Sequence, residues 1–296
     1  MVDQVREISI ALGDYSVARL LKENEVTCPR VKLNFADYPV INRAFAPMVR
    51  TLAFDVSELA LVTFLQALDA GKPLRLLPVV VVGRLHHGSI LYNPEKGPLT
   101  PADLKGRRVG MRAYSQTTGM WVRSILQHQY GVPMDEVTWV GTEGANVAEY
   151  KGPPNVEIRE GAKEMDMLSA GEVCAVLGGA KKAKDRGFKL LIPDAEAAAA
   201  EWYAKHKTVM INHMVAVTEE FMRKDPSAVR DVYHMLCQAT DMTASEREGG
   251  KLSAVGYGPD RIWDGGAIQL AMQYSIEQKL ISRTFDRKEI FAEVAG

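Results

Sequence analysis

Residues 8–22 read ISIALGDYSVARLLK and contain three structural signals in succession. The β-branched run at residues 8–12 is typical of a buried strand, and Gly13-Asp14-Tyr15 is typical of a tight loop. Residues 17–22 then have the apolar spacing of a helix. This strand, loop and helix unit predicts an α/β fold in which helices cover a mainly parallel sheet.

The same unit recurs further along the chain. Residues 31–35 alternate apolar and polar side chains and precede a helical stretch at 41–51. Ser57, after the strand-like residues 54–56, is the expected N-cap of a third helix. The apolar residues of that helix share one face: Leu59, Val62, Leu65 and Leu68.

The chain is expected to form two lobes. Further strand-like segments are residues 76–83, 88–92, 108–111, 137–140, 173–177, 190–192 and 209–217. Pro and Gly concentrate at 93–98, which predicts a crossing between lobes, and the strand at 209–217 would carry the chain back. We therefore expect residues 1–94 and 215–296 in one lobe and residues 95–214 in the other.

Composition excludes several classes of protein. The 296 residues carry 36 Lys and Arg against 37 Asp and Glu, a net charge of -1 that gives no footprint for nucleic acid. The most apolar stretch, residues 76–82, is far shorter than the about 20 residues of a membrane helix. The first ten residues contain acids and no long apolar segment, so we expect a cytoplasmic protein. The three cysteines are widely spaced and indicate buried thiols.

Polar loops follow the predicted strands and are the candidates for a ligand site, because ligands of open α/β sheets bind beyond the carboxyl ends of the strands. The loop at 114–118 precedes a helix whose free N–H groups would bind an oxyanion such as a carboxylate. These loops also have alternative explanations without a ligand. Ser115 or Thr117 would simply cap the helix, and Gly178-Gly179 would form a plain turn between a strand and a helix. The expected binding residues are Asp14, Tyr15, Ser57, Arg84, Tyr114, Ser115, Gln116, Thr117, Thr118, Gly178 and Gly179.

Histidines supply the candidates for acid and base chemistry. If residues 84–89 extend a strand, side chains alternate and only one of His86 and His87 faces a cleft. His213 lies in an apolar strand, where it is either a satisfied core residue or a site residue. Glu58 follows a predicted strand end, where it either points into the cleft or satisfies the first turn of its helix.

Seven stretches in fixed order carry a likeness to a known family: ISIALGDY at 8–15, FDVSEL at 54–59, RLHHGSI at 84–90, DLKGRRVG at 103–110, WVRSIL at 121–126, NHMV at 212–215 and YSIEQ at 274–278. Together they resemble the 4,5-dihydroxyphthalate decarboxylase family over nearly the whole chain. The resemblance implies the two-lobed fold of type 2 periplasmic binding proteins, an α/β fold with two crossover strands and a ligand between the lobes.

The resemblance also implies an activity, the non-oxidative decarboxylation of a hydroxylated aromatic carboxylate such as 4,5-dihydroxyphthalate, to protocatechuate, with no cofactor. On that activity His87, His213 and Glu58 are the expected catalytic residues, while Arg84 and the helix start at 114–118 would hold carboxylates. No ligand spacing in the sequence predicts a metal site. The alternative is a non-catalytic solute-binding protein for an organic anion, because receptors share this fold. Whether the chain forms a homo-oligomer is left open.

Overall fold

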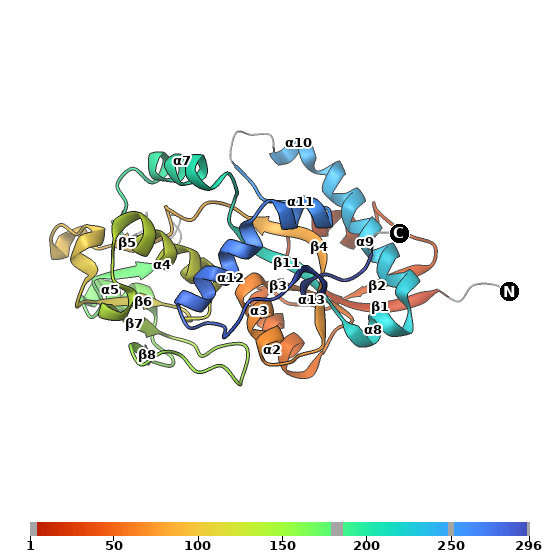
Figure 1. Cartoon of the computed structure of the whole chain (residues 1–296), viewed down its shortest axis with the longest axis horizontal. Helices are drawn as coiled ribbons and strands as arrows, with labels where there is room; N and C mark the ends of the chain where they lie inside the picture. Colours follow the sequence, from red (N-terminus) through yellow and green to blue (C-terminus); the bar gives the residue numbers. More distant parts are fainter. Residues whose placement is uncertain (1–4, 179–185, 248–251, 295–296) are drawn as a thin grey trace.

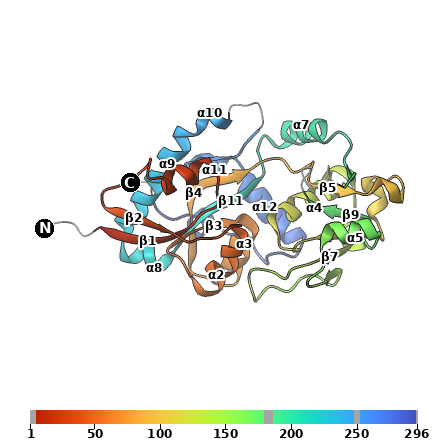
Figure 2. The same cartoon turned by 180° about the vertical axis from the view of Figure 1, so that it is seen from behind.

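Two six-stranded sheets lie toward opposite ends of the molecule in the computed structural model, which describes residues 5–178, 186–247 and 252–294 (Figure 1). Helices α3 (Leu61–Asp69), α4 (Thr117–Tyr130) and α12 (Ala267–Glu277) lie between the two sheets (Figure 2). This arrangement matches the predicted two-lobed α/β fold.

The first sheet has the strand order β12-β4-β11-β3-β1-β2. Its strands are β1 (Arg6–Ala11), β2 (Val31–Phe35), β3 (Val56–Ala60), β4 (Leu74–Gly83), β11 (Ile211–Thr218) and β12 (Gly256–Tyr257). The strands β1, β2 and β3 are parallel, whereas β11 is antiparallel to both β3 and β4. The expectation of a mainly parallel sheet therefore fails where the chain returns through β11.

The second sheet has the order β10-β5-β9-β6-β7-β8. Its strands are β5 (Ile90–Tyr92), β6 (Arg108–Met111), β7 (Thr138–Gly141), β8 (Val156–Ile158), β9 (Ala175–Leu177) and β10 (Lys189–Leu190). Here β6 to β9 are parallel, and β5 is antiparallel to β9. The second sheet thus has four neighbouring parallel strands, one more than the first.

The other helices that the structure describes pack on the sheets or on one another. They are α1 (Ser16–Lys22), α2 (Asn42–Thr51), α5 (Glu164–Ala170), α7 (Ala195–His206), α8 (Glu219–Lys224), α9 (Pro226–Met242), α10 (Ala244–Arg247), α11 (Pro259–Asp264) and α13 (Arg287–Ile290), with short 3₁₀ turns η1 (Pro94–Lys96), η2 (Pro101–Leu104) and η3 (Met134–Glu136). No helix among the described residues is both long and apolar enough to span a membrane.

The chain crosses between the lobes at residues 84–89 and again within residues 191–210, because β4 and β11 belong to the first sheet while β5 and β10 belong to the second. The expected boundaries near 94 and 215 are displaced from these crossings. Residues 93–98 contain η1, capped by the Asn93 side chain on the Glu95 N–H, so their Pro and Gly mark a local turn.

The third helix begins later than expected. All five residues of β3 are buried and pair with β1 and β11, so the strand continues through Glu58 to Ala60. Ala60 is the N-cap of α3, and it has no side-chain capping bond. Ser57 instead donates from Oγ to the carbonyl of Glu58 at 2.9 Å. The predicted N-cap at Ser57 is therefore wrong.

The two lobes share part of their hydrophobic core. One cluster of buried side chains includes Leu65 of α3, Leu126 of α4 and Ile268 of α12. Because α12 contacts both α3 and α4, the lobes meet over a packed interface rather than through the crossings alone.

A buried guanidinium reinforces this interface. Arg123 of α4 is fully buried and donates to Gln278 Oε1 and to the carbonyl of Tyr114, each at 2.7 Å. Its charged group also lies 3.9 Å from the centre of the Tyr114 ring. Arg123 thus ties the start of α4 to the end of α12.

We expect Arg123→Met to lower the free energy of unfolding by about 2 kcal/mol, because two buried acceptors lose a charged donor while the volume is kept. Urea unfolding followed by tryptophan fluorescence measures this change. Arg230→Met, at an exposed position on α9, serves as the control. A gain in stability for Arg123→Met would mean that burying the charge costs more than its hydrogen bonds contribute.

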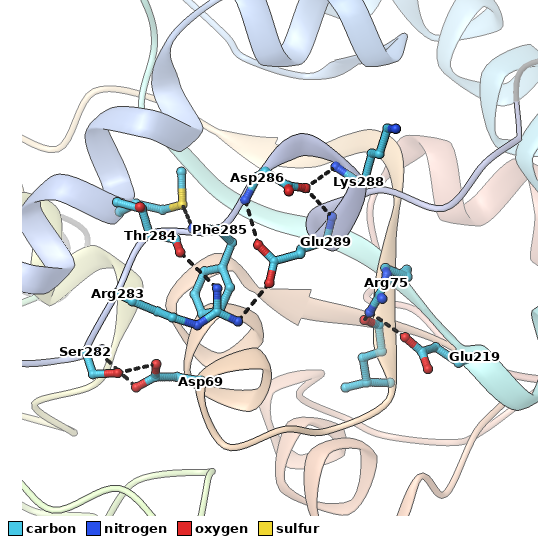
Figure 3. A network of polar contacts seen from close by, with 12 residues as sticks. Asp69, Arg75, Glu219, Ser282, Arg283, Thr284, Phe285, Asp286, Lys288 and Glu289 are labelled. Carbon is cyan, nitrogen blue, oxygen red and sulfur yellow. Dashed lines mark hydrogen bonds and ion pairs between the residues drawn. The ribbon is translucent and has the colours of Figure 1, made fainter.

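The C-terminal segment after α12 is fastened to the first lobe (Figure 3). Ser282 donates from its backbone N and its Oγ to the carboxylate of Asp69, at 2.9 and 2.7 Å. Asp286 and Glu289 form a reciprocal capping box at α13, and Arg283 pairs with Glu289. These contacts hold α12 in place beside α3.

Candidate active site

A cavity of about 250 Å³ opens between the lobes, beside the end of β4, the start of β11 and the start of α4. Six of the residues expected to bind or react with a ligand line it: Arg84, Ser115, Gln116, Thr117, Thr118 and His213. The cavity therefore collects side chains from both lobes, where a ligand of this fold is expected.

Glu58 and His213 form a hydrogen-bonded pair at the wall of the cavity. The imidazole Nδ1 lies 2.6 Å from Glu58 Oε1, and the ring packs edge-on against Phe45. The His213 side chain keeps 20% of its surface exposed, whereas that of Glu58 has none. With Nδ1 engaged by the carboxylate, Nε2 is the ring nitrogen left to meet a ligand.

The Glu58 carboxylate is held on its other side by the first βα loop. Its Oε2 accepts from the Tyr15 hydroxyl at 2.6 Å and from the Gly13 backbone N at 2.8 Å. Burial raises the pKa of Glu58, but its hydrogen bonds, foremost that from His213, outweigh burial and hold the pKa below its ordinary value. Glu58 is therefore a buried anion that orients the His213 imidazole.

The same contacts keep Tyr15 in its neutral form. Burial, together with the neighbouring Glu58 charge, raises the pKa of Tyr15 well above its ordinary value. Tyr15 therefore acts as a hydrogen-bond donor to Glu58 and holds the carboxylate oxygen that does not contact His213.

Two guanidinium groups line the cavity. Arg112 donates to Glu143 Oε2 at 2.7 Å, so its charge is partly committed. Arg84 is exposed, and its side chain has no hydrogen bond or ion pair within the described ranges. Arg84 is the cation available to an anionic ligand.

Two helix N-termini also meet at this cavity. Helix α4 begins after Gln116, which makes no side-chain capping bond. The Thr117 Oγ1 accepts from the Val62 backbone N of α3 at 3.0 Å, so Thr117 caps the helix of the opposite lobe and not its own. The positive ends of α3 and α4 thus both face the cavity and favour an anion there.

His87 lies apart from these residues. A hydrogen bond from the Ser89 backbone N to the His86 carbonyl at 3.0 Å makes the chain turn there, so the alternation expected for an extended strand does not occur. His87 is 1% exposed, and its Nε2 lies 3.0 Å from Gln129 Oε1 on α4. The cavity lining does not include His87.

The other expected binding residues also lie outside the cavity lining. Tyr114 donates from its hydroxyl to the Gln278 carbonyl at 3.2 Å, and Ser57 is buried in β3. Asp14 is exposed beyond β1, and Gly178 follows β9 beside Met165. Gly179 lies outside the described residues.

Comparison with known proteins places the chain among its relatives. The family model described as NMT1/THI5 like matches residues 63–248. The 4,5-dihydroxyphthalate decarboxylase of Comamonas testosteroni is 32% identical over 236 residues, which cover 74% of this chain and 70% of that protein. The chain belongs to this decarboxylase family. The Pseudomonas putida protein of the same name is 33% identical over 213 residues, 66% of this chain and 81% of that protein.

The fold of this family member also matches that of binding proteins. The alkanesulfonate-binding protein SsuA from Xanthomonas axonopodis pv. citri superposes with a TM-score of 0.61 at 16% identity, over 96% of this chain and 98% of that one. The likeness confirms the two-lobed fold and, at this identity, nothing about the ligand.

Several cavity residues of this family member were not expected from the sequence: Asn42, Phe45, Thr63, Arg112, Asn146 and Asn212. Arg112 directly follows β6, so the rule that ligands bind beyond strand ends would have found it. Asn212 lies next to His213 in β11, where its partners come from distant parts of the chain. Among the residues that the structure describes, no group of three His, Cys, Asp or Glu is placed to hold a metal ion.

Proposed function

We propose that this chain is a carboxy-lyase that removes carbon dioxide, without oxidation, from a hydroxylated benzene dicarboxylate of the 4,5-dihydroxyphthalate type. The single observation that carries the proposal is the buried Glu58 carboxylate on His213 Nδ1, which leaves Nε2 facing a cavity lined by Arg84. The names of its relatives in Comamonas testosteroni and Pseudomonas putida support the same reaction.

The cavity suits a substrate with two negative charges. Arg84 can bind a carboxylate through two parallel hydrogen bonds. On the facing side, the start of α4 offers backbone N–H groups and the hydroxyls of Thr117 and Thr118. A ring held by its carboxylates between these groups would present one carboxyl-bearing carbon to His213.

The reaction needs a proton at the ring carbon that carries the departing carboxylate. The hydroxyl para to that carboxylate loses its proton to water and pushes electron density toward the carbon. His213 Nε2–H protonates the carbon, and the ring then carries a ketone in place of the hydroxyl. The bond to the carboxylate breaks, its electron pair returns the ring to aromaticity, and the oxygen regains a proton. One proton replaces one carboxylate, and no electrons are exchanged.

Glu58 assists because its hydrogen bond with Nδ1 fixes the orientation of the His213 ring. A buried carboxylate on Nδ1 gives an imidazole this role in other enzymes that use histidine as acid and base. Tyr15 and Gly13 keep the carboxylate in place through their hydrogen bonds.

A non-catalytic receptor for an organic anion is the competing function, because proteins with the fold of SsuA are not tied to one function. Such a receptor needs Arg84 and the helix N-termini to bind the anion. It does not need a proton donor such as His213 held in place by Glu58. Incubation with 4,5-dihydroxyphthalate and measurement of released carbon dioxide separates the two functions. Catalytic release supports the decarboxylase, whereas binding without release supports the receptor.

We expect Arg84→Gln to raise the KM for 4,5-dihydroxyphthalate about 10- to 100-fold with a smaller change in kcat, because a charge-assisted hydrogen bond contributes about 1.5–3 kcal/mol. Steady-state kinetics measure both constants. The KM of Arg84→Lys should lie between those of the wild type and Arg84→Gln. Arg19→Gln, at an exposed position on α1, is the control. An unchanged KM for Arg84→Gln would remove Arg84 from the substrate site.

A further inference from the structure

Three side chains form a hydrogen-bonded chain from the first crossing to the cavity. His86 Nε2 lies 2.8 Å from Asn212 Oδ1, and Asn212 Nδ2 lies 3.1 Å from Thr118 Oγ1. His86 has no exposed surface, whereas Asn212 and Thr118 line the cavity. The chain joins the two lobes, because Asn212 belongs to β11 and Thr118 to α4.

The donors and acceptors fix the direction of this chain. An amide oxygen only accepts and an amide nitrogen only donates, so His86 must donate from Nε2–H and Asn212 must donate to Thr118. Burial, followed by the charge of Arg84, lowers the pKa of His86 to about 3, which keeps the imidazole neutral with one ring proton. The Ser89 hydroxyl lies 3.4 Å from Nδ1, where it can supply a proton to that nitrogen.

This direction determines the role of the Thr118 hydroxyl. Because Asn212 donates to its oxygen, the Thr118 proton is free to be donated to another acceptor. Thr117 is in the same position, since its oxygen accepts from the Val62 backbone N. Both threonines therefore meet a ligand as donors, which suits a carboxylate.

We propose that His86 is a positioning residue for ligand binding: by fixing the amide of Asn212, it makes Thr118 a hydrogen-bond donor to a carboxylate of the ligand. In the absence of His86 the Asn212 amide can rotate and present its oxygen to Thr118, whose proton then turns away from the cavity. The identity of the ligand rests on the proposed function, but its binding is measurable without turnover.

A double-mutant cycle between His86 and Thr118 tests this role. The Kd of 3,4-dihydroxybenzoate (protocatechuate), the product of the proposed reaction, is measured by calorimetry for the wild type, His86→Leu, Thr118→Val and the double variant. We expect each single change to weaken binding about tenfold, and the double variant to bind no more weakly than Thr118→Val. The amide nitrogen of His86→Gln can replace Nε2–H, so this variant should recover most of the affinity, as should Thr118→Ser.

A purely structural role for His86 would give a different pattern. The fold-losses in affinity of the two single variants would then multiply in the double variant. In addition, His86→Gln would not recover the affinity. Either result overturns the inference. If His86→Leu does not fold, as judged by urea unfolding, His86→Asn completes the cycle, because its shorter amide does not reach Asn212. Binding of the acid by a wild type that releases no carbon dioxide would overturn the proposed function while the cycle still tests His86.

Discussion

Replacing His213 by Gln should lower kcat for 4,5-dihydroxyphthalate by about 10²- to 10⁴-fold, the usual loss when a positioned acid or base is removed. Gln keeps a polar group near Glu58 but cannot deliver a proton to a ring carbon. Because Arg84 and the start of α4 stay in place, the KM should change by less than about threefold. Carbon dioxide release under saturating substrate gives both constants.

His87 provides the matched comparison for His213→Gln. His87→Gln changes the same type of residue at a buried position that lies outside the cavity lining. We expect this variant to keep kcat within about threefold of the wild type, because Gln129 keeps a hydrogen-bond partner. The assignment fails if His213→Gln retains full turnover, or if His87→Gln loses as much as His213→Gln does.

Replacing Glu58 by Gln should lower kcat by about 10³-fold or more, in line with the loss of the carboxylate that orients a catalytic imidazole in serine proteases. The change keeps the volume but removes the buried negative charge. It also places an amide nitrogen where either Tyr15 or His213 now donates. The imidazole then loses the carboxylate that fixes its orientation.

Two measurements show whether Glu58 acts through His213. Kinetics of the double variant Glu58→Gln, His213→Gln should match those of His213→Gln alone, because residues that act as a unit are not additive. Urea unfolding of Glu58→Gln checks that the protein remains folded. A double variant whose losses multiply would show that Glu58 acts on the reaction independently.

Local sequence pattern predicted the individual elements well. Residues 31–35 and 108–111 were expected as strands and are β2 and β6. The predicted N-cap at Ser57 was wrong because serine, a common cap residue, can also lie in a buried strand when its hydroxyl donates to a backbone carbonyl. The distinction depends on β1 and β11, which flank β3 and lie far from it in the sequence.

The site was predictable only in part, for the same reason. His213, Glu58 and Arg84 follow from polar residues at strand ends or within an apolar strand, and the structure brings His213 and Arg84 to one cavity with Glu58 behind. His86 and His87 are adjacent, yet their partners Asn212 and Gln129 are 126 and 42 residues away. No local pattern reveals which histidine turns toward which partner.

The most direct test is a crystal structure of the protein with bound 3,4-dihydroxybenzoate. We expect its carboxylate between the Arg84 guanidinium and the Thr118 hydroxyl, with an unsubstituted ring carbon about 3–3.5 Å from His213 Nε2, the distance of a near-attack arrangement. A bound acid that contacts neither Arg84 nor His213 would contradict the account.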